Sequence, residues 1–189
     1  MTVTKQTQAK IIQQAVSVLR AEGVIAYPTE YCFGLGCDPR SERAVQRLLE
    51  IKRRDKSQGV ILIAANSTQV QHYADLDSLA SKEQVLASWP GPNTWLLPAK
   101  PSVAQWVRGD HSTIAMRVPD HALCLALCEE FDHPIVSTSA NRHAQPAHLN
   151  AKDISVDMGG EVDMIIDASL GGASSASTIR HAISGEILR

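Results

Sequence analysis

Two clusters of polar residues in this sequence have the chemistry to bind a phosphate-bearing ligand. Lys52 and Arg54 are cations separated by one residue at the end of a predicted helix, a spacing suited to holding a polyanion from two sides. The second cluster follows an apolar stretch, and its hydroxyl and amide groups can orient a polar ligand without adding charge. Its members are Ser137, Thr138, Ser139 and Asn141. Each cluster also has a structural interpretation, because cations complement the dipole at a helix C-terminus and serine and asparagine cap helices.

Two further features favour a functional interpretation. Thr29 and Glu30 form a polar turn directly after an apolar run, and Gly34 and Gly36 follow them. Such a turn leaves small groups and free backbone N–H donors at the end of a sheet, where α/β folds bind ligands. Arg117 stands alone in an otherwise apolar predicted strand, and a buried arginine needs an anion. The residues alone therefore predict a cationic, hydroxyl-lined pocket for a phosphorylated or carboxylated small molecule.

The apolar spacing predicts alternating strands and helices around these residues. Helical periodicity places Lys52 on the inward apolar face of its helix and turns Arg53 about 100° away, toward solvent. The other predicted helices are 7–22, 81–89 (with Ser81 and Gln84 as a capping box), 103–107 and 121–131. The predicted strands are 24–27, 60–65, 93–98, 113–118, 135–138 and 162–167, with a closing hairpin over 177–189. This order predicts an α/β fold in which helices pack on a mixed, twisted sheet.

The composition limits the class of protein. A chain of 189 residues suits one domain over residues 1–189. No apolar run is long enough to cross a bilayer and the N-terminus lacks a signal peptide core, so we expect a cytoplasmic protein without membrane contact. The four cysteines form no CxxC pair and are expected to be reduced thiols, mostly buried. The net charge of −2 gives no bulk attraction to nucleic acid, so RNA binding would need a local patch.

Several familiar motifs do not occur in the sequence. It contains no GxxxxGK[ST] loop, no GxGxxG fingerprint, no HExxH and no GxSxG. A P-loop ATPase and a zinc hydrolase are therefore poor predictions.

Five segments together carry a resemblance to a known family. They are PTEYCFGLGCD, the helix that ends in Lys52, Arg53 and Arg54, WPGPNTWLLPA, AMRVPDH and VSTSAN. Their order and spacing resemble those of the YrdC family, the threonylcarbamoyl-AMP synthases of tRNA modification, in its short single-domain bacterial form. The resemblance covers the chain essentially from end to end. The lysine-x-arginine and serine-x-asparagine motifs of that family match Lys52 with Arg54 and Ser139 with Asn141.

The resemblance implies both a fold and a reaction. The fold would be the twisted α/β sheet shared with dihydroxybutanone-phosphate synthase, with a concave positive cavity. The reaction would be a nucleotidyl transfer that joins L-threonine, bicarbonate and ATP into threonylcarbamoyl-AMP and releases pyrophosphate. A separate transferase complex would then modify the tRNA adenosine next to the anticodon.

The resemblance also implies site residues. Phosphoryl chemistry depends mainly on positioning and fixed positive charge, so the cations would hold the phosphates of ATP alongside Mg²⁺, with no metal site made of protein side chains. The expected ATP site consists of Lys52, Arg54, Arg117, Ser139 and Asn141, of which Lys52 and Arg54 are catalytic. The expected threonine site consists of Thr29, Thr138 and Ser177.

Three positions depart from the pattern of many relatives, and two other functions remain as alternatives. Tyr31 replaces a threonine or serine, Asp55 a proline, and Gln58 a lysine or asparagine. Asp55 either weakens phosphate binding by Arg54 or holds the guanidinium in place.

One alternative function is an RNA-binding module in rRNA or tRNA maturation, although an aromatic and basic stripe is absent. The other is a lyase acting on sugar phosphates, which rests on the fold relationship alone and lacks its acidic metal-binding cluster.

Overall fold

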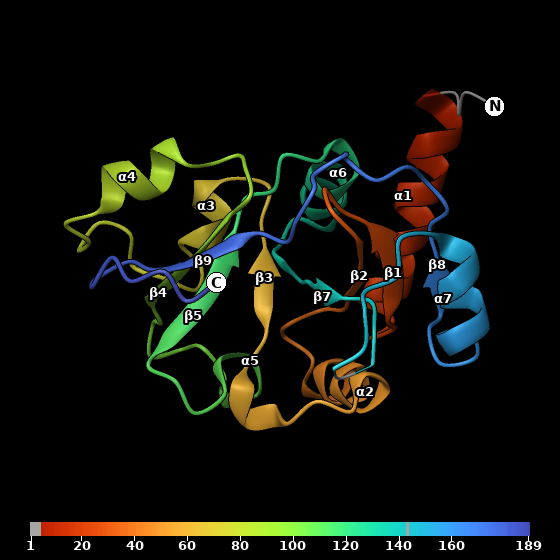
Figure 1. The fold of residues 1–189 in the computed structure, drawn as a ribbon, viewed down its shortest axis with the longest axis horizontal. Helices are drawn as coiled ribbons and strands as arrows, with labels where there is room; N and C mark the ends of the chain where they lie inside the picture. Colours follow the sequence, from red (N-terminus) through yellow and green to blue (C-terminus); the bar gives the residue numbers. More distant parts are fainter. Residues whose placement is uncertain (1–4, 143) are drawn as a thin grey trace.

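Two mixed β-sheets lie side by side in the computed structural model, which describes residues 5–142 and 144–189 (Figure 1). The first sheet has the order β7-β2-β1-β8, with bounds β1 Ile25–Pro28, β2 Phe33–Gly36, β7 Thr138–Ser139 and β8 Met164–Ile165. The second has the order β6-β3-β5-β4-β9, with bounds β3 Ile61–Ile63, β4 Asn93–Pro98, β5 Thr113–Arg117, β6 Ile135–Val136 and β9 Thr178–His181. Each sheet contains parallel and antiparallel pairs. The predicted α/β class is confirmed, but the strands are divided between two sheets instead of forming one.

The chain crosses between the two sheets at Ser137. The Ser137 amide donates to Ile61 O of the second sheet at 2.8 Å, and the Val136 amide donates to Cys37 O, directly after β2, at 3.0 Å. The following residues then pair with β2 of the first sheet. The predicted strand 135–138 is therefore two short strands that belong to different sheets, and the hydroxyl cluster lies where the sheets meet.

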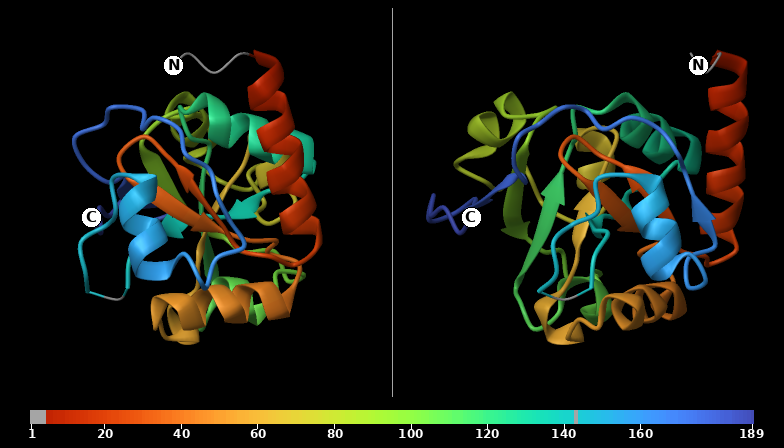
Figure 2. Two further views of the ribbon diagram at one scale, coloured as in Figure 1. Left: turned by 90° about the vertical axis from the view of Figure 1, so that its right-hand side faces the viewer. Right: turned by 45° about the vertical axis from the view of Figure 1, so that its right-hand side comes forward.

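Helix α1 (Lys5–Arg20) packs against α6 (Ala122–Phe131) over the first sheet. The apolar residues Ile12, Ala15, Val16 and Leu19 of α1 are buried, with Leu19 and Ala15 fully inaccessible to solvent. The helix ends at Arg20; Glu22 adopts a left-handed conformation (φ 61°), and the Gly23 amide donates to Val18 O at 2.9 Å. Figure 2 shows α1 along one side of the molecule and α2 across its base.

Helix α2 (Glu42–Lys52) confirms the orientation predicted for its cations. Its first turn is capped by Ser41, whose Oγ accepts from the Ala44 amide at 3.1 Å. Lys52 continues the buried face of the helix, with 4% of its surface exposed. Arg53 adopts the left-handed conformation that ends the helix (φ 52°) and is exposed to solvent. The chain therefore separates Lys52 from Arg53 at the helix terminus.

The remaining helices are short, and one prediction about them is wrong. They are the 3₁₀ helix η1 (Lys56–Gln58), α3 (Ser67–Val70), α4 (Lys82–Ala87), α5 (Gln105–Arg108) and α7 (Ala151–Met158). Ser81 precedes α4 but does not form the predicted capping box, because its Oγ donates to Ala182 O instead, at 2.6 Å. The closing hairpin is confirmed, since Arg180 pairs antiparallel with Ile187.

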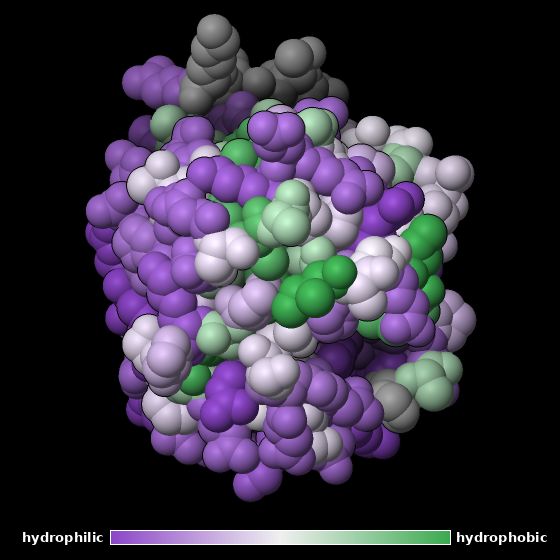
Figure 3. Space-filling view, turned by 90° about the vertical axis from the view of Figure 1, so that its left-hand side faces the viewer, coloured by the Kyte–Doolittle hydropathy of each residue, from purple (hydrophilic) through white to green (hydrophobic). Residues whose placement is uncertain are grey.

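The surface carries only scattered apolar side chains on the side that Figure 3 shows, where they form small groups among hydrophilic residues. None of the helices within the described residues is long and apolar enough to span a membrane. Cys37, Cys124 and Cys128 are buried free thiols, and Cys32 is half-buried. Burial raises the pKa of the Cys128 thiol to about 12, so this thiol is protonated at neutral pH.

Candidate functional site

A cavity of about 340 Å³ is lined by residues from both sheets. Its walls come from the turn between β1 and β2, from β3, from the facing parts of β4 and β5, and from the crossing segment 137–141. Arg54, Gln145, Ala147, residues of the C-terminal segment 173–177 and Arg189 also line it. Because each wall comes from a different part of the chain, the cavity collects side chains that are far apart in the sequence.

The cavity brings together all the predicted site residues except one. The predicted residues that line it are Thr29, Arg54, Arg117, Thr138, Ser139, Asn141 and Ser177. Lys52 does not line the cavity; it lies behind the turn that contains Ser139 and Asn141. The predicted ATP and threonine residues thus share one cavity, with Lys52 in direct contact with its wall.

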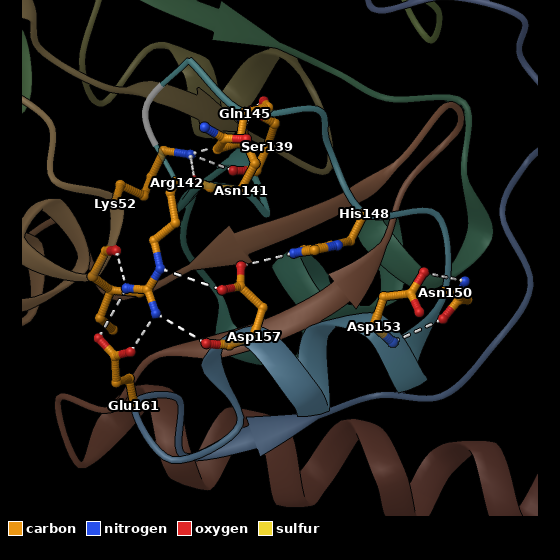
Figure 4. Close-up of polar contacts among 11 residues, drawn as sticks. Lys52, Ser139, Asn141, Arg142, Gln145, His148, Asn150, Asp153, Asp157 and Glu161 are labelled. Atoms are coloured by element: carbon orange, nitrogen blue, oxygen red, sulfur yellow. Dashed lines mark hydrogen bonds and ion pairs between the residues drawn. The ribbon is translucent and has the colours of Figure 1, made fainter.

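Lys52 joins the two motifs singled out in the sequence (Figure 4). Its ammonium donates to Ser139 O, and to Asn141 O and Oδ1 at 3.0 and 3.1 Å. Ser139 Oγ also donates to Asn141 Oδ1, at 2.6 Å. Burial, and then the nearby charge of Arg54, lower the pKa of Lys52 to about 8. Lys52 therefore holds the Ser139–Asn141 turn and carries a proton that it loses more readily than an ordinary lysine.

Arg54 is the cation of the α2 terminus that lines the cavity. Its Nη2 donates to Gly59 O at 3.0 Å, while its buried Nε has no hydrogen-bond partner within the described structure. Asp55 does not pair with it: the Asp55 carboxylate accepts from the Ser57 amide at 2.8 Å and caps η1. Part of the hydrogen-bonding capacity of Arg54 is therefore unused, and Asp55 neither holds nor neutralises this guanidinium.

Arg117 is bonded to an anion of the protein itself. Its Nη2 donates to Glu30 Oε2 at 2.6 Å, and the other carboxylate oxygen of Glu30 accepts from the Asp120 amide at 2.9 Å. Only about a tenth of either side chain is exposed. The prediction that Arg117 is buried and meets an anion is confirmed, but this anion is Glu30, which the sequence placed only in a polar turn.

Two hydroxyl groups of the predicted threonine site, those of Thr29 and Ser177, take part in hydrogen bonds within the protein. Thr29 Oγ1 donates to Cys32 O at 2.7 Å. Ser177 Oγ lies 2.8 Å from Thr94 Oγ1, a buried hydroxyl pair on the cavity wall. Thr94 lines the cavity but was not among the predicted site residues. The sequence indicated only that it lies in the predicted strand 93–98.

Arg189 is the second residue that sequence reasoning missed. Its Nε and Nη2 donate to Ser177 O at 3.2 and 3.1 Å, and it lines the cavity. Nothing in the sequence marks a terminal arginine as part of a site, because its contact depends on the hairpin that returns the chain to β9. With Arg54 and Arg117, it gives the cavity lining three guanidinium groups, and Glu30 is the one acidic side chain among the lining residues.

A metal ion would find few protein ligands here. The described residues contain no group of three or more histidine, cysteine, aspartate or glutamate side chains placed to hold a metal. Cys32 lines the cavity, but burial raises the pKa of its thiol, so it is protonated at neutral pH and is a poor ligand or nucleophile. The arrangement is suited to binding an anionic ligand through cations, hydroxyl groups and backbone groups.

Comparisons with known proteins relate this chain to one family. Residues 17–189 match the family model Sua5_yciO_yrdC, which carries the description telomere recombination. A threonylcarbamoyl-AMP synthase of Vibrio cholerae is 46% identical over 180 residues, which cover 94% of this chain and 96% of that protein. A threonylcarbamoyl-AMP synthase of Xanthomonas euvesicatoria pv. vesicatoria is 43% identical over 180 residues, which cover 94% of this chain and 96% of that protein.

Solved structures show the same fold. P. abyssi Sua5 complexed with L-threonine aligns with a TM-score of 0.84 and 31% identity over 92% of this chain. This chain spans about half of that protein, 51% of its length. E. coli YciO aligns with a TM-score of 0.80 over 95% of this chain and 88% of its own, and at 24% identity this likeness concerns the fold alone.

Proposed function

Because this chain belongs to the Sua5, YciO and YrdC family, we propose that it makes threonylcarbamoyl-AMP and pyrophosphate from L-threonine, bicarbonate and ATP. The observation that carries the proposal is the contact between the Lys52–Arg54 and Ser139–Asn141 motifs at the cavity with three lining cations. That geometry suits a triphosphate, and the relatives of nearly equal length carry the name of this activity.

The reaction needs positioning and positive charge more than it needs a nucleophile from the protein. The amine of threonine combines with bicarbonate to give a carbamate and water. A carbamate oxygen then forms a bond to the α-phosphorus of ATP, and the bond from this phosphorus to pyrophosphate breaks. Negative charge grows on the leaving pyrophosphate, so fixed cations at its position lower the barrier.

The cations divide this work by position. Arg54 lines the cavity with its guanidinium group and is proposed to bind the phosphates directly. Lys52 is proposed to contribute its charge from behind the Ser139–Asn141 turn, whose carbonyl groups it holds. Arg117 is proposed to meet the nucleotide with a guanidinium oriented by Glu30. Ser139 and Asn141 are proposed to orient the nucleotide.

Magnesium enters the proposal only through ATP. Glu30 is the one acidic side chain among the lining residues, and its two oxygens are bonded to Arg117 and to the Asp120 amide respectively. The residues described as lining the cavity therefore offer no pair of acidic side chains to hold Mg²⁺. We expect the ion to be held by the phosphate oxygens, and no step here depends on a metal bound by the protein.

The threonine end is proposed to lie at the hydroxyl-lined wall. A solved relative, P. abyssi Sua5, is described as a complex with L-threonine. In this chain Thr29, Thr138 and Ser177 line the cavity and are all less than a tenth exposed. Buried hydroxyl groups that hydrogen-bond a substrate hydroxyl reject an analogue lacking it.

We also propose the setting of the reaction. The product would pass in the cytoplasm to a separate transferase complex that modifies tRNA, and this chain would act as the nucleotidyltransferase. Direct RNA binding is not needed for the proposed step, and a net charge of −2 gives no broad attraction to RNA.

Pyrophosphate release tests the proposal. The protein is incubated with ATP, Mg²⁺ and bicarbonate, with and without L-threonine, and pyrophosphate is measured over time. We expect release that requires both threonine and bicarbonate. Release that ignores threonine, or RNA affinity with a steep salt dependence and no ATP turnover, would contradict the proposal and favour the RNA-binding alternative.

A further inference from the structure

Arg142 follows Asn141 directly and takes no part in the proposed chemistry. We propose that Arg142 is a positioning residue, which fixes the Ser139–Asn141 turn, and with it Lys52, for binding of the nucleotide. The inference deepens the proposed function and rests on it. It comes from the contacts that Arg142 makes with two helices on either side of the turn (Figure 4).

The first contact joins the turn to the end of α2. Arg142 Nη1 donates to Ile51 O at 2.7 Å. This carbonyl belongs to the last turn of α2, where four carbonyl groups have no partner within the helix. Ile51 is the neighbour of Lys52, whose ammonium reaches in the opposite direction to Ser139 and Asn141. Two cations therefore connect the two segments: Lys52 reaches from α2 to the turn, and Arg142 reaches from the end of the turn to α2.

The second contact joins the turn to α7 and the residues after it. Arg142 Nη1 and Nη2 bind both carboxylate oxygens of Glu161, and Nη2 also donates to Asp157 O at 3.0 Å. The Arg142 side chain is 18% exposed, and its bonds form a fork with fixed geometry. An arginine held in this way orders its surroundings more strongly than a single exposed ion pair does.

A further bond supports the other end of the same loop. His148 Nε2 lies 2.9 Å from Asp157 Oδ2, and the His148 amide donates to Ala140 O at 3.1 Å. The Ala140 amide in turn donates to Phe33 O at 2.8 Å. Asp157 thus lies close to both Arg142 and His148, and α7 supports the turn from outside the cavity.

Arg142 should affect the binding of ATP but not the binding of threonine. The turn carries Ser139 and Asn141 and receives Lys52, all of which belong to the proposed nucleotide site. The threonine site is held differently: Thr29 and Ser177 are bonded to Cys32 and Thr94, and Thr138 pairs with Leu35 of β2. None of these contacts involves Arg142. Loss of Arg142 should therefore weaken the binding of ATP and leave the binding of threonine nearly unchanged.

The experiment compares Arg142→Ala with a matched control, Arg47→Ala. Arg47 lies on α2 and, like Arg142, bonds Glu161, donating to its carbonyl oxygen at 2.7 Å. It also bonds Asp163, and its hydrogen bonds within the described structure include none to the turn. The measurements are KM for ATP and for L-threonine from pyrophosphate release, calorimetric binding of a non-hydrolysable ATP analogue, and hydrogen exchange of the amides of 139–142.

We expect Arg142→Ala to raise KM for ATP and Kd for the analogue by roughly ten- to a hundredfold, with faster exchange in 139–142 and KM for threonine nearly constant. Arg47→Ala should leave these values within about twofold. Arg142→Lys keeps the charge but loses the fork, and it should fall between the two. If Arg142→Ala does not fold, Arg142→Lys carries the comparison.

The positioning role would be overturned if Arg142→Ala had the same ATP affinity and amide exchange as Arg47→Ala. Equal rises in KM for ATP and KM for threonine in Arg142→Ala would also overturn it. Analogue binding and exchange require no turnover. Absence of pyrophosphate release by the wild-type protein would therefore refute the proposed function while these two readouts still decide the role of Arg142.

Discussion

Alanine substitution of the three consecutive cations at the end of α2 distinguishes a specific phosphate site from a diffuse positive surface. Lys52 is 4% exposed and bonded to the Ser139–Asn141 turn, and Arg54 lines the cavity. Arg53 carries the same charge but points to solvent. Charge alone would make the three equivalent, whereas the structure makes Arg53 the bystander.

The magnitudes follow from these environments. Loss of one donor to a developing anion costs on the order of a hundredfold in rate, about 2.7 kcal/mol of barrier, so we expect at least that for Lys52→Ala and Arg54→Ala. Lys52→Ala also removes three hydrogen bonds, which costs about 2–3 kcal/mol of unfolding free energy. Arg53→Ala should change rate and stability little, by about 0.5 kcal/mol at most.

The assay is pyrophosphate release at saturating ATP and threonine, with thermal melts as the folding control. Lys52→Ala should melt lower than wild type yet remain folded at 25 °C, because native domains typically have about 5–15 kcal/mol of stability. Lys52→Met serves as a second control, since it keeps the aliphatic part of the side chain. Equal loss of activity in all three alanine variants would refute the reasoning and indicate a diffuse positive surface.

Four further predictions concern the cavity and the end of α2. Arg117→Ala leaves Glu30 buried without its partner and should lower the free energy of unfolding by about 3–5 kcal/mol in urea melts; a loss below about 1 kcal/mol would contradict the buried pair. Because burial and a nearby charge lower the pKa of Lys52 to about 8, binding of an ATP analogue should weaken as the pH rises through about 8. The folded protein releases this proton at a lower pH than the unfolded chain does, so the contribution of Lys52 to the free energy of unfolding should increase from pH 8 toward 10.5. A Lys52→Met variant should lack both this increase and the pH dependence of analogue binding. Arg53→Gly removes the backbone strain of a left-handed residue, so it should raise the free energy of unfolding by roughly 0.5–1 kcal/mol and with it the melting temperature, with pyrophosphate release unchanged. A lower melting temperature would contradict the cap geometry. Valine in place of threonine should support much slower pyrophosphate release, and equal rates would contradict the hydroxyl-lined threonine site.

Local patterns predicted much of the fold and the inward position of Lys52. Periodicity depends on the chain geometry within one element, so the burial of Lys52, the exposure of Arg53 and the strand Asn93–Pro98 followed directly from the spacing of apolar residues. The strand 135–138 was predicted as a unit, because its sequence cannot show that neighbouring residues pair with different sheets.

Contacts between distant segments were beyond such patterns. The partner of Arg117 lies 87 residues earlier in the chain, at Glu30, and only the folded turn between β1 and β2 brings the two together. Arg189 reaches the cavity because the C-terminal hairpin folds back on β9. Ser81 matched a capping pattern, but a tertiary bond to Ala182 replaced the local one. The family resemblance supplied the ATP and threonine assignments, which no local pattern contains.

The central claim is that this cavity joins threonine, bicarbonate and ATP in one product. The most direct measurement uses ¹⁴C-labelled bicarbonate with ATP, Mg²⁺ and L-threonine, separates the nucleotides by chromatography, and identifies the labelled species by mass. We predict one labelled threonylcarbamoyl-AMP for each pyrophosphate released, and loss of both products in Arg54→Ala. Pyrophosphate formed without label in a nucleotide product, or label incorporation that persists in Arg54→Ala, would contradict the account.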